Sequence, residues 1–362
     1  MMLDGQTEVA PGPPPDGAAP AHHTRRALGY AKGLLQKSAL RLVAYLLIAY
    51  LVLKLIPALE EAFSSLQHAS LPWVLGALAL ETVSEMGFVV SWSAIVDPQN
   101  LLTAEGRGKR MDTRVAWAQL GGGTLIPGGS YGGLGVGAWL LHRLGMPSKL
   151  IGEREFNLSF LNTAVDGLAL VIFGLALASG ILPGSRNLLL TLLPAAVAAG
   201  AIAAALLIAN RAARHVERRP VKHARVAVAI DTLAKAVEDT QQLLFHRGRY
   251  RAVLGAFVYL MFDVLVLWSA FIAVHAHPMP SFAVVVMAYI IGALGGSIPL
   301  PAGIGTIGGM VGAFILYGVN HDAAFAAVLL YQAIGLLVPL VGGGIAYAVL
   351  RVDLRRTSDA RA

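Results

Sequence analysis

Residues 121–145 read GGGTLIPGGSYGGLGVGAWLLHRLG, and residues 294–318 read LGGSIPLPAGIGTIGGMVGAFILYG. A shift of 173 positions superposes the two stretches without a gap and places Gly145 on Gly318. Both stretches have small residues first, a Pro-Gly core and then an apolar tail. A repeat of this kind determines the architecture, so we interpret the pair as an internal duplication.

The composition is that of an integral membrane protein. Hydrophobic residues make up 56% of the chain and charged residues only 14%. Several apolar runs reach the length of about 20 residues that a membrane-spanning helix needs. The chain has no cysteine, which excludes disulfides, thiolate chemistry and Cys-ligated zinc. The net charge of +7 comes from basic loops between apolar runs, so we expect membrane lipids and no nucleic acid as partners.

Three parts follow from these patterns. We expect residues 1–38 to be a disordered, basic cytoplasmic tail, residues 39–350 to be a single transmembrane domain, and residues 351–362 to be a cytoplasmic C-terminal tail. The positive-inside rule places both termini in the cytoplasm and the protein in the plasma membrane as a multi-pass chain. The predicted spanning helices cover residues 42–56, 72–96, 156–178, 188–210, 252–274 and 324–350.

Residues 211–251 form a large basic cytoplasmic loop. Apolar residues recur within it at helical spacing, which is typical of an amphipathic helix lying on the inner leaflet. A solvated connector that carries positive-inside charges explains the same pattern, and both interpretations stay open. The residues that would contact lipid headgroups are Arg218, Arg219, Lys222 and Arg225.

The first glycine-rich stretch lies between two basic loops, so it leaves the cytoplasm and returns to it. Its arms, residues 115–126 and 132–144, are each too short to span a bilayer. We therefore predict a re-entrant helical hairpin broken at Pro127. The second stretch starts and finishes outside. The fold class is then an all-α membrane bundle with two inverted repeats, about 72–180 and 252–350, which is typical of transporters.

Ionisable residues inside the predicted spans are candidates for a substrate or ion pathway. A charge at the bilayer centre costs about 2.5–3.5 kcal/mol, so such groups usually face a cavity or a partner. The alternative is a hydrogen-bonded carboxyl that only holds helices together. No Lys or Arg lies deep in a run, which favours a proton, a cation or a positively charged headgroup as partner. The candidates are Glu81, Glu85, Asn162, Asp166 and Asp263.

The two broken hairpins are candidates for approach of a lipid headgroup. Free N–H groups at the start of a half-helix suit a phosphate, and glycine allows it to come close. Tight helix packing accounts for part of the glycine content as well. The residues concerned are Pro127, Gly128, Gly129, Gly132 and Gly133 in the first copy, and Pro299, Pro301, Gly303 and Gly305 in the second.

The run SIPLPAGIGTIGG and the later LYGVNHDAAFAAVLLYQAIGLLVPLVGGGIAY resemble the lysylphosphatidylglycerol synthase transmembrane region, also described as a flippase-like domain. The first copy, TLIPGGSYGGLGVGAWLLHRLGMP, is similar to its N-terminal counterpart. The resemblance implies a protein that moves a phospholipid or a glycosylated lipid between leaflets. Family members that make aminoacyl lipids carry a soluble synthase domain, which does not follow Arg356 here. An arginine frequent in the family's last helix region is Gln332 in this chain.

The leading hypothesis is a lipid translocase that is not an enzyme. Two alternatives remain: a non-transporting partner of a lipid-modifying enzyme, and a proton-coupled transporter of a small solute. The sequence has no Walker motif and no dinucleotide fingerprint, so we expect no cofactor. His275 and His277 share a loop without a further ligand nearby, so we expect no metal site.

Overall fold

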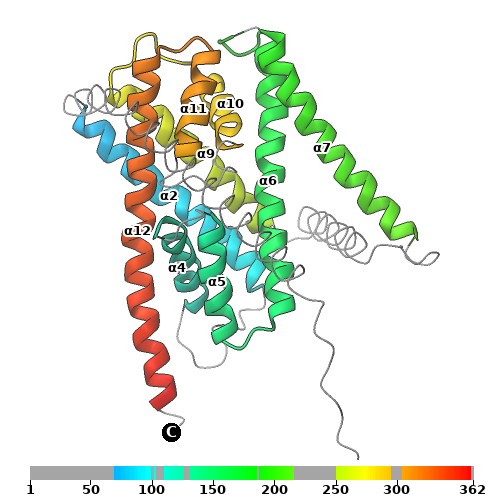
Figure 1. Cartoon of the computed structure of the whole chain (residues 1–362), viewed down its shortest axis with the longest axis vertical. Helices are drawn as coiled ribbons and strands as arrows, with labels where there is room; N and C mark the ends of the chain where they lie inside the picture. Colours follow the sequence, from blue (N-terminus) through cyan, green and yellow to red (C-terminus); the bar gives the residue numbers. More distant parts are fainter. Residues whose placement is uncertain are drawn as a thin grey trace, which may run out of the picture. The chain divides into compact units, whose positions relative to one another are not determined.

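The computed structural model describes residues 69–98, 102, 110–125, 130–185, 187–215, 250–294 and 304–359, which all belong to one compact unit, Glu60–Ala362. These ranges contain helices and no strand (Figure 1). The expectations for residues 1–38, for the helix 42–56 and for the basic-loop residues Arg218, Arg219, Lys222 and Arg225 lie outside them. The helices are α2 (Leu71–Val96), α4 (Met111–Leu125), α5 (Ser130–Arg143), α6 (Ser148–Ala178), α7 (Leu188–His215), α9 (Tyr250–Ala273), α10 (Phe282–Ala293), α11 (Ile304–Leu316) and α12 (His321–Asp359).

Five of these helices, α2, α6, α7, α9 and α12, are long and apolar enough to cross a membrane. They match the predicted spans, and the two largest differences are at α6 and α12. Helix α6 begins at Ser148 rather than Phe156, because the charged residues of that segment are good helix formers. Helix α12 runs to Asp359, so it includes most of the expected C-terminal tail. Both extensions carry charged side chains past the apolar part of a span.

The remaining short helices form two packed pairs, α4 with α5 and α10 with α11. Figure 1 shows the first pair towards one end of the unit and the second towards the other. The second helix of each pair, α5 or α11, lies inside one glycine-rich stretch, and the first helix ends within the stretch (α4) or just before it (α10). The residues that join the members of each pair, including Pro127, Gly128, Gly129, Pro299, Pro301 and Gly303, lie outside the described residues.

The two stretches that match in sequence also match in backbone geometry at their ends. Gly145 after α5 has φ +91° and Gly318 after α11 has φ +82°. This left-handed conformation favours glycine, and it closes a helix with a 6→1 hydrogen bond. Met146 N donates to Leu141 O at 3.0 Å, and Val319 N donates to Phe314 O at 3.0 Å. The next helices, α6 and α12, start at residues 148 and 321, again 173 positions apart.

Helices α2 and α9 form the most extensive packed pair and run antiparallel at the centre of the unit. Ser70 N, just before α2, donates to Ala273 O at the end of α9 at 2.9 Å. A Cβ atom at Gly87 would lie 2.6 Å from Tyr259 N, and one at Gly255 would lie 2.6 Å from Ser91 N. The backbones of α2 and α9 are therefore in direct contact at Gly87 and Gly255, a close approach that small residues allow in membrane helices.

The outward side of α7 is apolar, with Leu189, Leu193, Val197 and Leu207 exposed. An exposed apolar face on a helix of this length is suited to contact with lipid acyl chains. Most of the buried polar and charged side chains of the described residues lie elsewhere, on α2, α4, α6 and α9.

Candidate functional site: a polar cavity and its carboxylates

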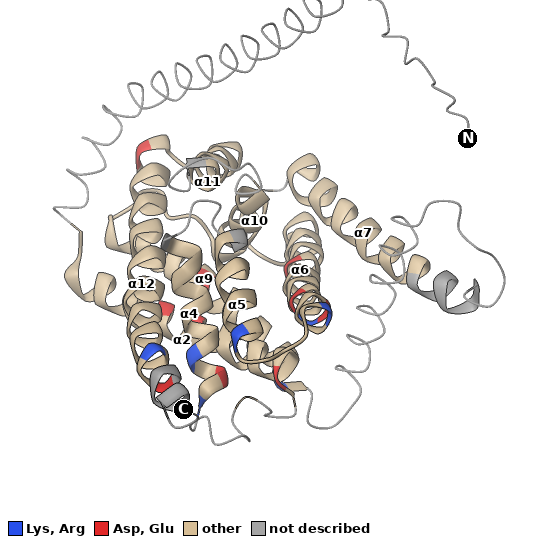
Figure 2. Ribbon diagram, turned by 60° about the horizontal axis from the view of Figure 1, so that its bottom comes forward, with Lys and Arg blue, Asp and Glu red and all other residues tan. Residues whose placement is uncertain are grey.

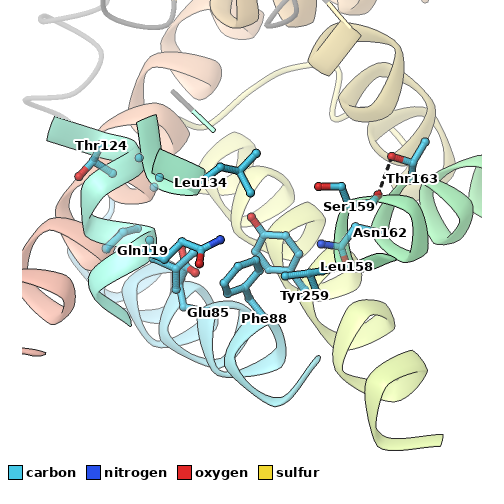
Figure 3. Close-up of a pocket in the computed structure, with 15 residues that line it drawn as sticks. Glu85, Phe88, Gln119, Thr124, Leu134, Leu158, Ser159, Asn162, Thr163 and Tyr259 are labelled. Carbon is cyan, nitrogen blue, oxygen red and sulfur yellow. Dashed lines mark hydrogen bonds between the residues drawn. The ribbon is translucent and has the colours of Figure 1, made fainter. Parts of the chain in front are cut away.

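A cavity of about 410 Å³ opens between helices of both sequence halves. In Figure 3, Glu85 and Gln119 lie on one side, Ser159 and Asn162 lie on the other, and the Tyr259 ring lies between them. Six helices contribute to the wall: α2, α4, α5, α6, α9 and α12. The lining residues are Glu85, Phe88, Gln119, Leu120, Gly123, Thr124, Gly133, Leu134, Leu158, Ser159, Asn162, Thr163, Tyr259, Gly335 and Pro339.

Helix α6 presents a polar face to this cavity. Glu155, Ser159, Asn162 and Asp166 follow one another at spacings of i, i+4, i+7 and i+11, which places them on one side of a helix. Ser159 and Asn162 line the cavity, and the oxygen Oδ1 of Asn162 has no hydrogen-bond partner among the described residues. Thr163 also lines it, and its hydroxyl donates to Ser159 O at 2.9 Å (Figure 3). A spanning helix therefore carries a continuous polar stripe.

Glu85 is the acidic residue of the cavity wall. Its side chain is only 4% exposed, and its oxygen Oε2 has no hydrogen-bond partner within the described ranges. Glu81, one turn earlier on α2, is equally buried, and Oε2 of Glu81 also lacks a partner there. Gly335 of α12 lies beside this side chain, and a Cβ atom at that position would be in ordinary contact with Glu81 Oε1, at 3.6 Å. The predicted common face of Glu81 and Glu85 therefore points into the bundle.

Asp263 lies in a closed environment beside the cavity. Its oxygen Oδ2 accepts hydrogen bonds from the hydroxyls of Tyr289 of α10 and Tyr331 of α12, the latter at 3.1 Å. The two tyrosine rings pack edge to face. Asp263 lies close enough to Glu81 and Glu85 to interact with them electrostatically. These three carboxylates do not form a metal site, and no group of three or more His, Asp or Glu side chains among the described residues is arranged to hold a metal ion. The carboxylate thus joins three helices.

Two further predicted positions have different surroundings. Asp166 is partly exposed on α6 and interacts electrostatically with Asp263. In the first glycine-rich stretch, Gly132 is buried, and Gly133 lines the cavity next to α4, where a Cβ atom would lie 2.8 Å from Gln119 O. In the second, Gly305 lies half-buried in α11, away from the cavity residues named above. The structure thus brings Glu85, Asn162 and Gly133 to one cavity and leaves Gly305 apart.

Glu155 of α6 is a buried acidic residue beside the cavity that was not among the candidates from sequence. The indole Nε1 of Trp92 donates to Gln119 Oε1 at 2.8 Å, and Gln119 Nε2 donates to Glu155 Oε2 at 3.0 Å. These bonds connect α2, α4 and α6 beside the cavity. Glu155 lies in a charged stretch, and that pattern predicts a loop where α6 has already begun. Its spacing from Ser159 and Asn162 is the signal that could have identified it.

Basic residues of the described helices gather at one end of the unit (Figure 2). Arg114 at the start of α4 forms an ion pair with Asp353 near the end of α12. Arg154 near the start of α6 donates to Val96 O at the end of α2 at 2.6 Å. This end is packed with apolar side chains that include Trp92, Met111 and Leu350. This apolar cluster also includes Phe88 and Leu158 of the cavity wall, so it adjoins the cavity.

The cavity, the spanning helices and the paired short helices provide the setting for a comparison with known proteins. No curated protein matches the chain in sequence. A family model described as "Lysylphosphatidylglycerol synthase TM region" matches residues 39–343, which cover all the cavity residues. The resemblance noted from the glycine-rich stretches is confirmed: the chain belongs to the family of the lysylphosphatidylglycerol synthase TM region.

Proposed function

We propose that the protein is a membrane lipid translocase that moves a phospholipid or a glycosylated lipid between leaflets. The observation that carries this proposal is the polar cavity of about 410 Å³ inside an apolar bundle. Pockets of roughly 300–1,000 Å³ hold small molecules. The exposed residues Ser159 and Thr163 belong to its α6 wall, so a headgroup can bind inside while its acyl chains remain in the bilayer.

The described lining suits a headgroup that donates hydrogen bonds or carries positive charge. Glu85 and Asn162 supply acceptor oxygens without partners, and none of the described lining residues is Lys or Arg. The first turn of α5, which includes Gly132 and Gly133, supplies backbone N–H groups that suit a phosphate. A zwitterionic or amine-bearing phospholipid combines both features. The proposal includes no covalent chemistry.

The two halves form inverted repeats in this proposal, and the paired short helices are re-entrant hairpins. The matched starts of α6 and α12 and the matched helix ends at Gly145 and Gly318 support a duplication. The antiparallel packing of α2 against α9 supports opposite orientation of the halves. In transporters of this architecture, the substrate binds where broken helices meet near the bilayer midplane.

The basic end of the unit is cytoplasmic in this proposal, and the membrane is the plasma membrane. Clustering of Arg114, Arg154 and the other basic residues at one end supports this orientation through the positive-inside rule (Figure 2). The absence of cysteine allows a direct test, because a single introduced cysteine has no background. Cysteines at Lys149 and Asp322, which are exposed and 173 positions apart, should react with impermeant reagents from opposite sides.

A second candidate is a proton-coupled transporter of a small solute. The buried carboxyl groups Glu81 and Glu85 favour it, since intramembrane carboxyl groups commonly serve as proton relays. The third reading, a docking partner of a lipid-modifying enzyme, depends on the loop 211–251 and finds its support in sequence alone.

The test is leaflet exchange of fluorescent lipids by purified protein in proteoliposomes. Anionic, zwitterionic, lysyl-modified and glycosylated lipids are compared, with and without a pH gradient. The wild type should exchange at least one lipid class, and Glu85→Gln should abolish most of that exchange. Glu153→Gln is the matched control, because Glu153 is an acidic residue of α6 outside the cavity lining.

Each outcome separates the candidates. Exchange that is lost in Glu85→Gln and kept in Glu153→Gln supports the lipid translocase. Failure of folded wild-type protein to exchange any lipid contradicts it. In that case, uptake of a small solute driven by a pH gradient would favour the second candidate, and absence of any uptake would favour the docking partner.

A further inference from the structure

Glu155 is buried inside the protein, with 7% of its surface exposed, and it was not among the residues that the sequence singled out. It lies on the polar face of α6, one turn before Ser159, which lines the cavity. The side chain that separates Glu155 from the cavity is Gln119, itself part of the cavity wall.

The hydrogen bonds around Gln119 have only one consistent direction. The indole N–H of Trp92 can only donate, so Gln119 Oε1 must accept from it. The amide Nε2 of Gln119 then faces Glu155 and donates to Oε2. Oxygen Oε2 of Glu155 is therefore an acceptor in either protonation state. The proton of the neutral carboxyl group belongs on the other oxygen, Oε1.

Oxygen Oε1 of Glu155 is buried and has no hydrogen-bond partner among the described residues. A buried carboxylate oxygen without a partner loses its hydration and gains nothing in return. Binding of a proton lowers this cost, because a neutral carboxyl group is less costly to bury than a charged one. Among the described residues, Oε1 of Glu155 is thus the one oxygen or nitrogen atom of this bridge that has no hydrogen-bond partner.

Charged groups around this bridge are already engaged or lie across the cavity. On α6 itself, the Arg154 guanidinium donates to the carbonyl of Val96. Arg114 of α4 pairs with Asp353 of α12, and Glu85 of α2 borders the cavity. Among the described residues, the uncharged Gln119 amide donates to the Glu155 carboxyl, and the uncharged Trp92 indole interacts with both side chains.

We infer that Glu155 is a proton-binding site coupled to the cavity through Gln119, and that its loading and unloading accompany transport. The coupling to transport rests on the proposed function, whereas the proton site rests on the geometry around Glu155 alone. Uptake adds one proton at Oε1 and makes the carboxyl neutral, and release returns the proton and the negative charge. A change of charge beside the cavity alters the binding of a charged headgroup there.

The test combines a direct readout of the carboxyl group with the leaflet-exchange assay. Difference infrared spectra of the reconstituted full chain are recorded on a pH step, in the region of the protonated carboxyl stretch. Glu155→Gln should remove one band that Glu153→Gln retains. In the leaflet-exchange assay, Glu155→Gln should reduce the effect of a pH gradient on the exchange rate about tenfold, as expected for a typical coupling between two sites. Gln119→Leu keeps the carboxyl and should shift its band.

Outcomes of this test separate the inference from the proposed function. A band that is unchanged in Glu155→Gln overturns the proton site, whatever the transport result. A lost band with an intact gradient response overturns the coupling. A lost band in a protein that exchanges no lipid supports the proton site and contradicts the translocase. If Glu155→Gln does not fold, the band of Gln119→Leu decides, and an unshifted band overturns the link to the cavity.

Discussion

Asp263 and Glu85 are two buried carboxylates on helices that touch, yet their surroundings differ. Two tyrosine hydroxyls from α10 and α12 donate to Asp263, whereas Oε2 of Glu85 has no partner in the described part of the chain and the residue lines the cavity. Asp263 is 6% exposed and Glu85 is 4% exposed, so burial does not distinguish them. The difference lies in the partners. A carboxylate that is already bonded holds helices together, and one that lacks a bond is available to a ligand.

The largest effect is expected from removal of the acceptor at Asp263. Asp263→Leu leaves the hydroxyls of Tyr289 and Tyr331 buried without an acceptor, and each such group costs about 1–3 kcal/mol. We expect a loss of about 4 kcal/mol in unfolding free energy, measured by denaturation in detergent. Asp263→Asn keeps an acceptor oxygen and should cost less than about 1.5 kcal/mol. Equal losses in both variants would contradict the role as a joint.

Glu85 should show the opposite pattern, with little loss of stability and a large loss of transport. Glu85→Gln keeps the size of the side chain but removes its charge, so the free energy of unfolding should change by less than about 1 kcal/mol. Leaflet exchange should fall about a hundredfold, the size expected when a charged partner of a ligand is lost. Comparable stability losses in Glu85→Gln and Asp263→Leu would remove the distinction between the two carboxylates.

A glycine pair on α5 tests how the Gln119 bridge contributes. A Cβ atom at Gly137 would lie 2.1 Å from Gln119 Oε1, while nothing lies within 4 Å of a Cβ atom at Gly135. Gly137→Ala should therefore displace the Gln119 amide and cost about 1–2 kcal/mol of stability. Gly135→Ala should be neutral or slightly stabilising, because alanine favours helix. Thermal unfolding of the two variants, side by side, measures the difference.

The smallest effect is expected at the basic end. The ion pair between Arg114 and Asp353 is partly exposed, with 31% and 25% of the side chains accessible. Such pairs contribute about 0–1 kcal/mol. Arg114→Ala should lower stability by less than about 1 kcal/mol, and added salt should reduce the difference. A larger, salt-independent loss would show that this end of the bundle is held by more than packing.

Much of the fold was predictable from local patterns. The apolar runs predicted five of the long helices, and α2 (Leu71–Val96) lies within one residue of the predicted span 72–96. The four-residue spacing of Glu81 and Glu85 predicted a common buried face. Local patterns failed at Glu155, because Lys149, Glu153 and Arg154 suggested a solvated loop where α6 had already begun.

Contacts between distant segments were not predictable from one sequence. Tyr289 and Tyr331 lie in apolar runs and look like ordinary lipid-facing or core aromatic residues. Their meeting at Asp263 depends on how α9, α10 and α12 pack, which no local pattern records. The same holds for Gln119, whose role requires Trp92 and Glu155 from two other helices.

The cavity is lined by one of the two pairs of short helices and not by the other. Gly123, Thr124, Gly133 and Leu134 of α4 and α5 line it, and none of its described lining residues comes from α10 or α11. In a transporter with inverted repeats, as proposed above, the two halves exchange conformations during transport. The space beside α4 and α5 then closes, and an equivalent space opens beside α10 and α11. Under the proposed function, the opposite-facing state should therefore have an exit lined by α10 and α11 in place of α4 and α5.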